Sequence, residues 1–177
     1  MHNLASRRRP AHPRTPTRAH LSATHAARAA RPGDAADIHA LIATFVDDGR
    51  LLPRALHEVE SALDDFVVIV DRHDRVQACA ALAEYSPSLA EVSSVAVAPQ
   101  AQGMGLGSLA VRSVEAVARR RGVVELFALS LAEPFFVSLG YARTHLAAFP
   151  EKVARYEALV DRGVSVTPKA CFHKTIA

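Results

Sequence analysis

The residues best suited to bind a ligand form a glycine-rich loop, Gln102-Gly103-Met104-Gly105-Leu106-Gly107. This loop lies between a predicted strand and a helix predicted to begin at about Gly105. Glycine lets a phosphate approach the backbone closely, because it has no Cβ atom in the way. The first turn of a helix adds unpaired N–H groups and about half a unit of positive charge. Because the loop contains no lysine, backbone donors must do the binding, and the pattern predicts an anion site.

Three kinds of anion-binding loop compete for this pattern. A Walker loop requires GxxxxGK[ST], which the sequence lacks. The dinucleotide fingerprint GxGxxG/A fits Gly105–Ala110, but its acidic residue should end the second strand, whereas Glu125 opens one. Pro99–Gln102 also separate the first strand from the glycines. The third pattern, [RQ]-x-x-G-x-[GA], is the pyrophosphate loop of acyl-CoA N-acyltransferases, and Gln102, Gly105 and Gly107 fill it. A purely structural glycine turn remains the alternative.

Hydrophobic periodicity predicts the elements that position this loop. The apolar, β-branched run Phe66–Val70 is typical of a strand covered on both faces, and Asp34 is expected to cap the first helix. The predicted order β-α-α-β-β-β-α-β-α-β-β describes an α/β protein with a mixed sheet and helices on both faces. Strands are expected at residues 24–31, 66–70, 76–83, 91–98, 124–129, 141–146 and 171–176, and helices at 34–46, 55–63, 105–121 and 134–139.

The positive charge of the chain is concentrated at its N-terminus. Residues 1–24 contain five arginines and no acid, and the formal net charge of the whole chain is +3, so the rest carries −2. The high pI therefore does not indicate a nucleic-acid-binding surface. Residues 1–23, which include three prolines, are expected to be a disordered basic tail, and residues 24–177 one domain. An upstream start codon chosen in error or an arm for an anionic partner are the alternative readings of the tail.

Composition excludes several other classes of protein. Two cysteines, Cys79 and Cys171, give no disulfide framework, which fits a reducing cytoplasm. Nine histidines occur without HxxxH or HExxH spacing, so no metal site is expected. No apolar run approaches the ~18 residues of a membrane span, and no apolar segment follows the basic N-terminus as in a secretory signal.

From about Arg28 to Ile176 the sequence resembles the GNAT superfamily of acyl-CoA N-acyltransferases. ARAARPGDAADIHALI looks like its first strand and helix, EVSSVAVAPQAQGMGLGSLAV like its central motif, and FFVSLGY like its late helix. GRLLPR, AEVSSVAV, ELFALS and FFVSLGY are further similar to amino-acid N-acetyltransferases, above all to the acetyltransferase domain of N-acetylglutamate synthases. The amino-acid kinase domain that some of those enzymes carry is missing, as in a short stand-alone form. The resemblance implies the GNAT fold and acetyl-CoA as co-substrate.

The resemblance also assigns roles along the central strand and the glycine loop. It implies that the strand ends in a splay, where the backbone of Val95, Ala96 and Val97 binds the pantetheine arm. The N–H of Val97 would polarise the thioester carbonyl. As an alternative, Val95 and Val97 are ordinary core residues. The remaining CoA contacts would come from Gln102, Gly103, Met104, Gly105, Leu106, Gly107, Ser108 and Phe136.

Glu91 is the candidate base that takes a proton from the acceptor amine, directly or through a water. The alternative is a solvated carboxylate at a strand end. Many relatives place a tyrosine where this chain has Phe136, and a phenyl ring cannot protonate the leaving thiolate. The rings of Phe135 and Phe136 would pack against the pantetheine arm or the core. Tyr141, Ser130 or solvent remain as proton sources.

Arg54 and Lys169 are the candidate residues for acceptor recognition. In the synthases that the chain resembles, an arginine after LL or LV faces the glutamate carboxylate, and a planar guanidinium suits a carboxylate bidentately. The leading hypothesis is an amino-acid N-acetyltransferase that acts on glutamate and initiates arginine synthesis. Alternatives are an acetyltransferase for another small amine or a protein amine, a CoA-binding sensor without catalysis, and a nucleic-acid module that uses the arginine tail. A homodimer is left open.

Overall fold

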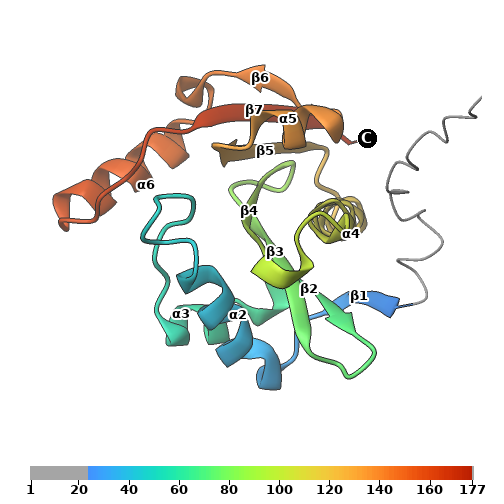
Figure 1. Ribbon diagram of the computed structural model, residues 1–177. Helices are drawn as coiled ribbons and strands as arrows, with labels where there is room; N and C mark the ends of the chain where they lie inside the picture. The colour runs from blue at the N-terminus through green and yellow to red at the C-terminus, as the bar shows by residue number, and fades with distance from the viewer. Residues whose placement is uncertain (1–23, 177) are drawn as a thin grey trace, which may run out of the picture.

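The computed structural model describes residues 24–176, so the expectations for the N-terminal tail lie outside the described residues. These residues form a seven-stranded sheet of order β1-β2-β3-β4-β5-β7-β6 (Figure 1). The strands are β1 (His25–Ala29), β2 (Phe66–Asp71), β3 (Val76–Glu84), β4 (Leu89–Val97), β5 (Glu125–Ser130), β6 (Ala142–Thr144) and β7 (Ala170–Thr175). The helices are α2 (Ala35–Ala43), α3 (Leu56–Ser61), α4 (Leu106–Arg120), α5 (Glu133–Ser138) and α6 (Pro150–Asp161), with short 3-10 turns at Pro32–Asp34, Leu63–Asp65, Pro99–Ala101 and Leu146–Ala148.

The sheet is antiparallel except between β4 and β5, which run parallel. Pairing of β4 with β5 stops at Glu91, which lies opposite Phe127, although β4 continues to Val97 and β5 to Ser130. The two strands therefore diverge, and the edge of β4 beyond Glu91 is left unpaired on this side. This arrangement confirms the expected splay of the central strand.

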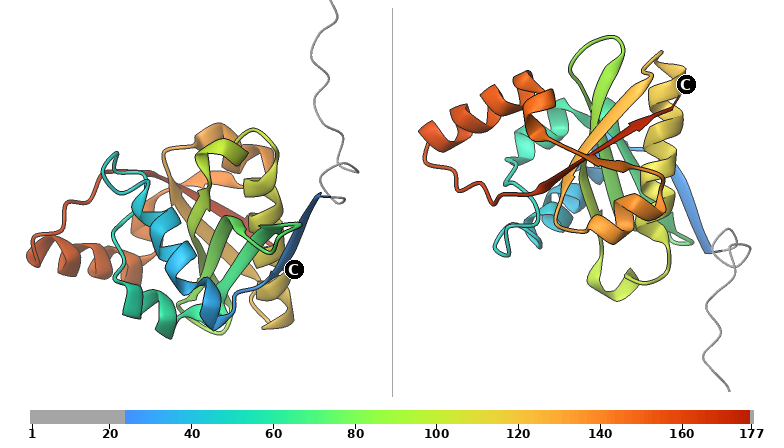
Figure 2. Two further views of the ribbon diagram at one scale, coloured as in Figure 1. Left: turned by 60° about the horizontal axis from the view of Figure 1, so that its bottom comes forward. Right: turned by 90° about the horizontal axis from the view of Figure 1, so that it is seen from above.

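Helices cover both faces of the sheet. In Figure 1 the helix α4 lies on one side of β2–β4, and α2 and α3 lie on the other. The buried stripe of α4 includes Leu106, Ala110 and Val114, which face the strands. Both views of Figure 2 show α6 projecting from the body of the protein. No helix within residues 24–176 is both long enough and apolar enough to cross a membrane.

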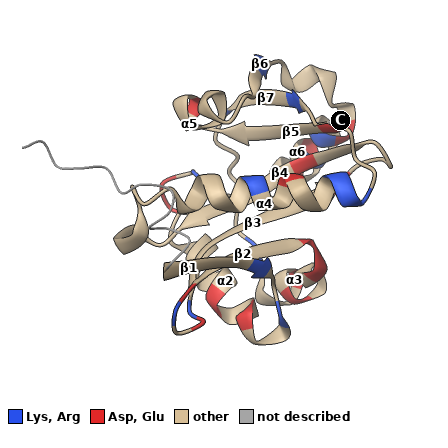
Figure 3. Ribbon diagram, turned by 90° about the vertical axis from the view of Figure 1, so that its right-hand side faces the viewer, with Lys and Arg blue, Asp and Glu red and all other residues tan. Residues whose placement is uncertain are grey.

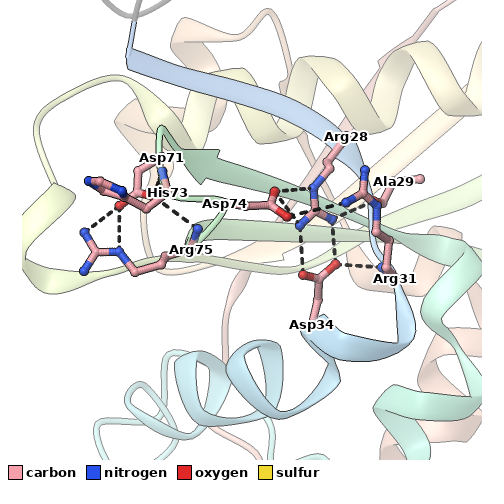
Figure 4. Close-up of polar contacts among 8 residues, drawn as sticks. All are labelled: Arg28, Ala29, Arg31, Asp34, Asp71, His73, Asp74 and Arg75. Atoms are coloured by element: carbon pink, nitrogen blue, oxygen red, sulfur yellow. Dashed lines mark hydrogen bonds and ion pairs between the residues drawn. The ribbon is translucent and has the colours of Figure 1, made fainter.

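Arg28 of the first strand bridges Asp34, just before α2, and the turn between β2 and β3 (Figure 4). The Asp34 carboxylate accepts hydrogen bonds from Arg28 at 2.6 and 2.9 Å and from the N–H of Arg31 at 2.7 Å. Arg28 also donates to Asp74, which lies in that turn, at 3.0 Å. Asp34 does stand at the N-cap of α2, but its side chain caps no N–H of that helix, so the expected cap is wrong in this respect. The carboxylate instead binds the Arg28 guanidinium, and Arg28 in turn reaches Asp74 in the turn between β2 and β3.

Replacing Asp34 with alanine is expected to lower the free energy of unfolding by about 2–3 kcal/mol at pH 7, since it leaves the nearly buried Arg28 guanidinium without its main partner. The Arg28 guanidinium lowers the pKa of Asp34, so this stabilisation is present above the unfolded-state pKa and is lost as the pH falls through the folded one. Urea unfolding at pH 7 and at pH 3 checks both points. Asp74→Ala, at a more exposed position, is the control and should cost less than about 1 kcal/mol. Equal losses in the two variants would contradict the central role of Asp34.

The expected order of elements is confirmed with one addition, the helix α6. No element was expected between residues 146 and 171, yet α6 occupies Pro150–Asp161. Its start and stop signals are visible in the sequence, because Pro150 is at its first position and Gly163, with φ of 80°, follows its end. The apolar stripe that normally reveals a helix is missing, since the one buried residue of α6 is Lys152. The first helix also ends earlier than expected, at Ala43 rather than Val46.

Candidate active site

The central strand β4 contains a bulge next to the point where it leaves β5. Ser94 has a positive φ of 51°, which is uncommon for a residue with a side chain, and the register with β3 shifts between Cys79 and Ala81. The Cys79 thiol donates to the carbonyl of Ser94 at 3.4 Å. A bulge of this kind turns the following residues relative to the sheet, and it occurs often next to active sites.

The backbone of Val97 faces the unpaired edge of β4. The N–H of Ala98 donates to Gln77 of β3 at 2.8 Å, and successive N–H groups along a strand point to opposite edges. The N–H groups of Val97 and Val95 therefore point away from β3, whereas that of Ala96 points toward it. Gln102 donates from its side-chain amide to the Val97 carbonyl at 3.3 Å. Of the three residues expected to bind pantetheine, Val95 and Val97 thus have amides at the free edge, and Ala96 does not.

The glycine loop leads directly into α4. Gly103 and Gly105 have φ of 77° and 80°, and Gly105 is the N-cap. The first N–H that bonds back within the helix is that of Leu109, to the Gly105 carbonyl at 3.1 Å, so the N–H groups of Leu106, Gly107 and Ser108 come before the first helical hydrogen bond. No acidic side chain lies in the first turn, and the basic residues of α4 are concentrated toward its other end (Figure 3). This helix start can accept an anion.

Gly107 brings the start of α4 against the free edge of β4. A Cβ atom at this position would lie 3.3 Å from a methyl group of Val97 and 3.4 Å from the ring of Phe135. The close approach places the anion-binding loop beside the unpaired strand edge. Met104, half-buried, packs on the main core and holds the loop in place. Sequence reasoning predicted this juxtaposition from the resemblance, and the contact at Gly107 gives it a physical basis.

Phe136 does not lie where the CoA assignment needs it. Its ring is 3% exposed and stacks on Phe172 at 5.6 Å, with Tyr141 in edge contact at 5.3 Å. The expected contact between Phe136 and the cofactor is therefore corrected, because the ring is enclosed in the core. The half-buried ring next to the glycine loop is that of Phe135.

Neither of the alternative proton donors lines the cleft described below. Tyr141 is 2% exposed, its hydroxyl forms no hydrogen bond with another residue in the described part of the chain, and burial raises its pKa. Ser130, half-buried at the end of β5, accepts a hydrogen bond from the N–H of Ala132, and its own hydroxyl hydrogen is not used in that contact. Ser130 and solvent are left as proton sources.

A cleft of about 450 Å³ opens on the side of β4 that carries Glu91. Its walls come from the loop before α3, from α3 and the segment that leads into β2, from strands β3, β4 and β5, from α6, and from the segment before β7. Six basic and four acidic side chains line it: Arg50, Arg54, Lys152, Arg155, Arg162 and Lys169, with Glu58, Asp65, Glu84 and Glu91. The cleft thus brings together the three residues, Glu91, Arg54 and Lys169, that the sequence analysis chose for catalysis and acceptor binding.

Glu91 is a buried carboxylate and not a solvated one. It is the third residue of β4, is 4% exposed, and its Oε2 accepts hydrogen bonds from the Tyr85 hydroxyl at 3.0 Å and the Lys152 ammonium at 2.8 Å. Burial lowers the pKa of Lys152, while Glu91 acts in the opposite direction. Lys152 also lies 4.7 Å from the centre of the Tyr156 ring.

Arg54 and Lys169 are cations without acidic partners. Within residues 24–176 neither has a carboxylate within salt-bridge distance, and the Arg54 guanidinium lies over the Phe66 ring at 5.6 Å. Burial and the nearby Arg155 lower the pKa of Arg54, and burial and Lys152 lower that of Lys169. Six basic against four acidic side chains leave the cleft with an excess of positive charge, which makes it attractive to an anion.

Sequence reasoning missed the contribution of α6 to this cleft. Lys152, Arg155 and Tyr156 all line it, and Arg155, like Arg54, has no acidic partner in the described part of the chain. These residues stand at i, i+3 and i+4, the spacing of one helix face. That spacing, together with Pro150 and Gly163, was the signal available in the sequence.

Comparison with known proteins identifies the class of this protein. The sequence model of the acetyltransferase (GNAT) family matches residues 36–143. The chain is 35% identical over 128 residues to an uncharacterized N-acetyltransferase, CT2212, of Chlorobaculum tepidum, with 72% of this chain and 82% of that protein covered. The chain therefore belongs to the acetyltransferase (GNAT) family.

Within the family, several similar proteins act on amino acids. Over 127 residues the chain is 35% identical to an amino-acid acetyltransferase of Ralstonia nicotianae, covering 70% of this chain but 28% of that enzyme. The N-acetylglutamate synthase of Neisseria gonorrhoeae, complexed with coenzyme A and N-acetyl-glutamate, matches with a TM-score of 0.75 and 26% identity, over 86% of this chain and 35% of that one. Rv2747 of Mycobacterium tuberculosis, in complex with CoA and a ligand designated NLQ, matches with a TM-score of 0.72 and 25% identity over 85% and 98% of the chains.

Proposed function

We propose that this chain transfers the acetyl group of acetyl-CoA to the α-amine of L-glutamate, a reaction that would begin arginine biosynthesis in the cytoplasm. One observation carries the proposal: a cleft lined by Arg54, Arg155 and Lys169, none of which has an acidic partner among residues 24–176, contains the buried Glu91 at the point where β4 leaves β5. The cations suit a dicarboxylic acceptor, and the free strand edge suits an acyl thioester. The amino-acid acetyltransferases among the relatives support the same substrate class.

The residues of the loop and the strand edge fit coenzyme A. Gly103 and Gly105 have a positive φ, a backbone conformation that favours glycine, so the loop carries no side chain at these two positions. The N–H groups of Leu106, Gly107 and Ser108 can donate to a pyrophosphate. The amides of Val95 and Val97 can pair with the pantetheine arm as a strand would. When bound, acetyl-CoA supplies an activated acetyl group. The Val97 N–H would donate to the thioester carbonyl oxygen and stabilise the negative charge that develops there.

The acceptor amine must lose a proton before it attacks. At pH 7 this costs about 1.4 kcal/mol for an amine of pKa ~8 and about 4.6 kcal/mol for a lysine-like amine of pKa ~10.4. Glu91 would take this proton, and Arg54 and Lys169 would hold the carboxylates of the acceptor. The thiolate that leaves would be protonated by Ser130 or by solvent, because Phe136 cannot donate and Tyr141 is enclosed.

Release of free CoA thiol, measured with acetyl-CoA and each of the twenty amino acids and common polyamines, tests the proposal. The expected result is turnover with glutamate, followed by other acidic or amide amino acids. Turnover with a polyamine or a protein amine in place of glutamate would show a different acceptor. Binding of CoA without turnover on any amine would overturn the enzymatic assignment in favour of a sensor.

Replacing Gly105 with alanine is expected to raise the KM for acetyl-CoA three- to tenfold. A side chain at a positive φ costs about 1 kcal/mol and displaces the N–H groups that face the pyrophosphate. Gly122→Ala is a matched control, because Gly122 has φ of 84° just beyond the other end of α4. Both variants should lose similar stability, and only Gly105→Ala should change the KM for acetyl-CoA. Equal KM values in the two variants would remove the loop from the CoA site.

A further inference from the structure

Helix α6 packs on the rest of the protein through a buried lysine, Lys152, where most helices use apolar side chains. Lys152 is the buried residue of α6, at 5% exposure, and it lies against a carboxylate instead of an apolar surface. Its ammonium is 2.8 Å from Glu91 of β4, although the two residues are 61 positions apart in the chain. Removing two charges from water costs several kcal/mol per ion, so such a pair weakly favours the fold at most. A contribution to stability therefore does not account for the Lys152–Glu91 pair, and its position in the acceptor cleft indicates a role in the active site.

The hydrogen bonds on Glu91 are all on one oxygen. Oε2 accepts from both Tyr85 and Lys152, whereas no donor among residues 24–176 bonds to Oε1. A carboxylate held by one oxygen on two donors has a fixed orientation, and its second oxygen is available to a group in the cleft. An acceptor amine, or a water next to it, is such a group.

The other charged and titratable groups around Glu91 do not replace Lys152. Arg54 and Lys169 lie on other walls of the cleft and Arg155 lies on α6 itself, and none of the three forms an ion pair with Glu91. Tyr85, Tyr156 and Cys171 are neutral, with burial raising the pKa of each. The thiol of Cys171 has a pKa raised to about 11. Lys152 is thus the cation in direct contact with the carboxylate among the described residues.

We propose that Lys152 is the positioning residue for Glu91: through this ion pair, α6 holds the carboxylate turned with Oε1 toward the acceptor amine. The inference rests on the proposed function, in which Glu91 takes the proton of the amine. In this role Lys152 acts through Glu91. Helix α6 would in this way both line the acceptor cleft and orient the general base, Glu91.

The pH dependence of kcat/KM in Lys152→Met and Lys152→Arg tests the proposal. Without the cation, ionised Glu91 is buried without compensation, so a higher pH is needed to ionise it. In Lys152→Met the acid limb should move up by at least one pH unit, so that the loss of kcat/KM grows toward low pH and is small at pH 9. Lys152→Arg, which keeps the charge, should restore most of the acid limb. An acid limb in Lys152→Met that coincides with that of the unmodified chain would overturn the proposal.

Lys174→Met is the matched control for a merely structural role. Lys174 forms a similar pair with the buried Glu115 at 2.7 Å, between β7 and α4 and outside the cleft. Its replacement should lower the melting temperature as Lys152→Met does, without moving the acid limb. If both variants moved the limb equally, general destabilisation would explain the result and the proposal would fail.

A readout that needs no turnover separates this inference from the proposed function. The side-chain carboxyl of Glu91, labelled with ¹³C and assigned by its loss in Glu91→Gln, can be titrated by NMR. In Lys152→Met its titration midpoint should rise by at least one pH unit, and an unchanged midpoint would overturn the inference. A raised midpoint in a protein that acetylates no amine would support the inference and overturn the proposed function.

Discussion

Glu91→Gln is expected to lower kcat by about a hundredfold at pH 7, within the 10²–10⁴-fold range of general base catalysis. Glutamine keeps the shape of the side chain and can still accept from Tyr85, but it cannot take a proton. The variant then depends on amine that has lost its proton in solution, a fraction that grows about tenfold per pH unit below the pKa of the amine. The loss should therefore be greatest below neutral pH and shrink as the pH rises. Initial rates of thiol release with saturating glutamate, measured between pH 6 and pH 9, check both the size and the slope.

The burial of Glu91 makes a second variant necessary. In Glu91→Gln the Lys152 ammonium stays buried without its anion, and breaking a buried pair in this way costs about 3–5 kcal/mol. The double variant Glu91→Gln/Lys152→Met removes both charges and should recover much of the lost stability without recovering activity. Recovery of kcat in the double variant would show that misfolding, and not loss of the base, caused the defect. A pH–rate profile unchanged in Glu91→Gln would remove Glu91 from the mechanism.

The parts of the fold that follow from local sequence signals were predictable. The apolar run at Phe66–Val70 became the fully buried strand β2, and the glycines at 103 and 105 became a loop with positive φ that leads into α4. Both signals lie within a few residues of one another, so tertiary contacts were not needed to read them. The resemblance added the splay of β4, which no pattern of single residues predicts.

The parts of the site that depend on distant contacts were not predictable. The sequence analysis placed Glu91 near the cleft from its position on a strand. The cation that contacts its carboxylate is Lys152, which belongs to a helix with no apolar stripe. Phe135 and Phe136 are adjacent in the sequence, and only the packing of Phe172 and Tyr141 decides which ring is enclosed in the core. In both cases the deciding partner lies more than about one helical turn away, where periodicity carries no information.

The charge of the cleft also has consequences for its specificity. Of its six basic residues, Lys152 is paired with Glu91 and Arg50 with Asp48, while the others have no acidic partner in the described structure: Arg54, Arg155, Arg162 and Lys169. An amino acid with two carboxylates would neutralise more of this positive charge than an amino acid with an uncharged side chain. Selectivity for an acidic acceptor would then depend on individual cations that line the cleft, among them Arg54 and Lys169, which the sequence analysis also chose for acceptor binding.

Arg54→Ala is expected to raise the KM for glutamate by tenfold to a hundredfold, because charge-assisted hydrogen bonds to a carboxylate contribute about 1.5–3 kcal/mol. The kcat and the KM for acetyl-CoA should change little, since Arg54 lies away from the glycine loop and the reacting atoms. The KM for glutamate of Arg54→Lys should be intermediate, because an ammonium keeps the charge but cannot bind a carboxylate bidentately. Steady-state kinetics with glutamate and with a neutral amino acid measure the selectivity, which is the ratio of the two kcat/KM values. This ratio should fall as the KM for glutamate rises.

Arg50→Ala is the matched control for that prediction. Arg50 lines the same cleft, but it is exposed and already paired with Asp48 at 2.9 Å, so its removal should change the KM for glutamate less than threefold. The Arg54 guanidinium also lies over the Phe66 ring, and the loss of this contact should cost at most about 1 kcal/mol of stability. A melting temperature measured for each variant separates that effect from binding. A KM for glutamate unchanged in Arg54→Ala, with the enzyme otherwise active, would remove Arg54 from the acceptor site and leave Arg155 and Lys169 as the cations that select the substrate.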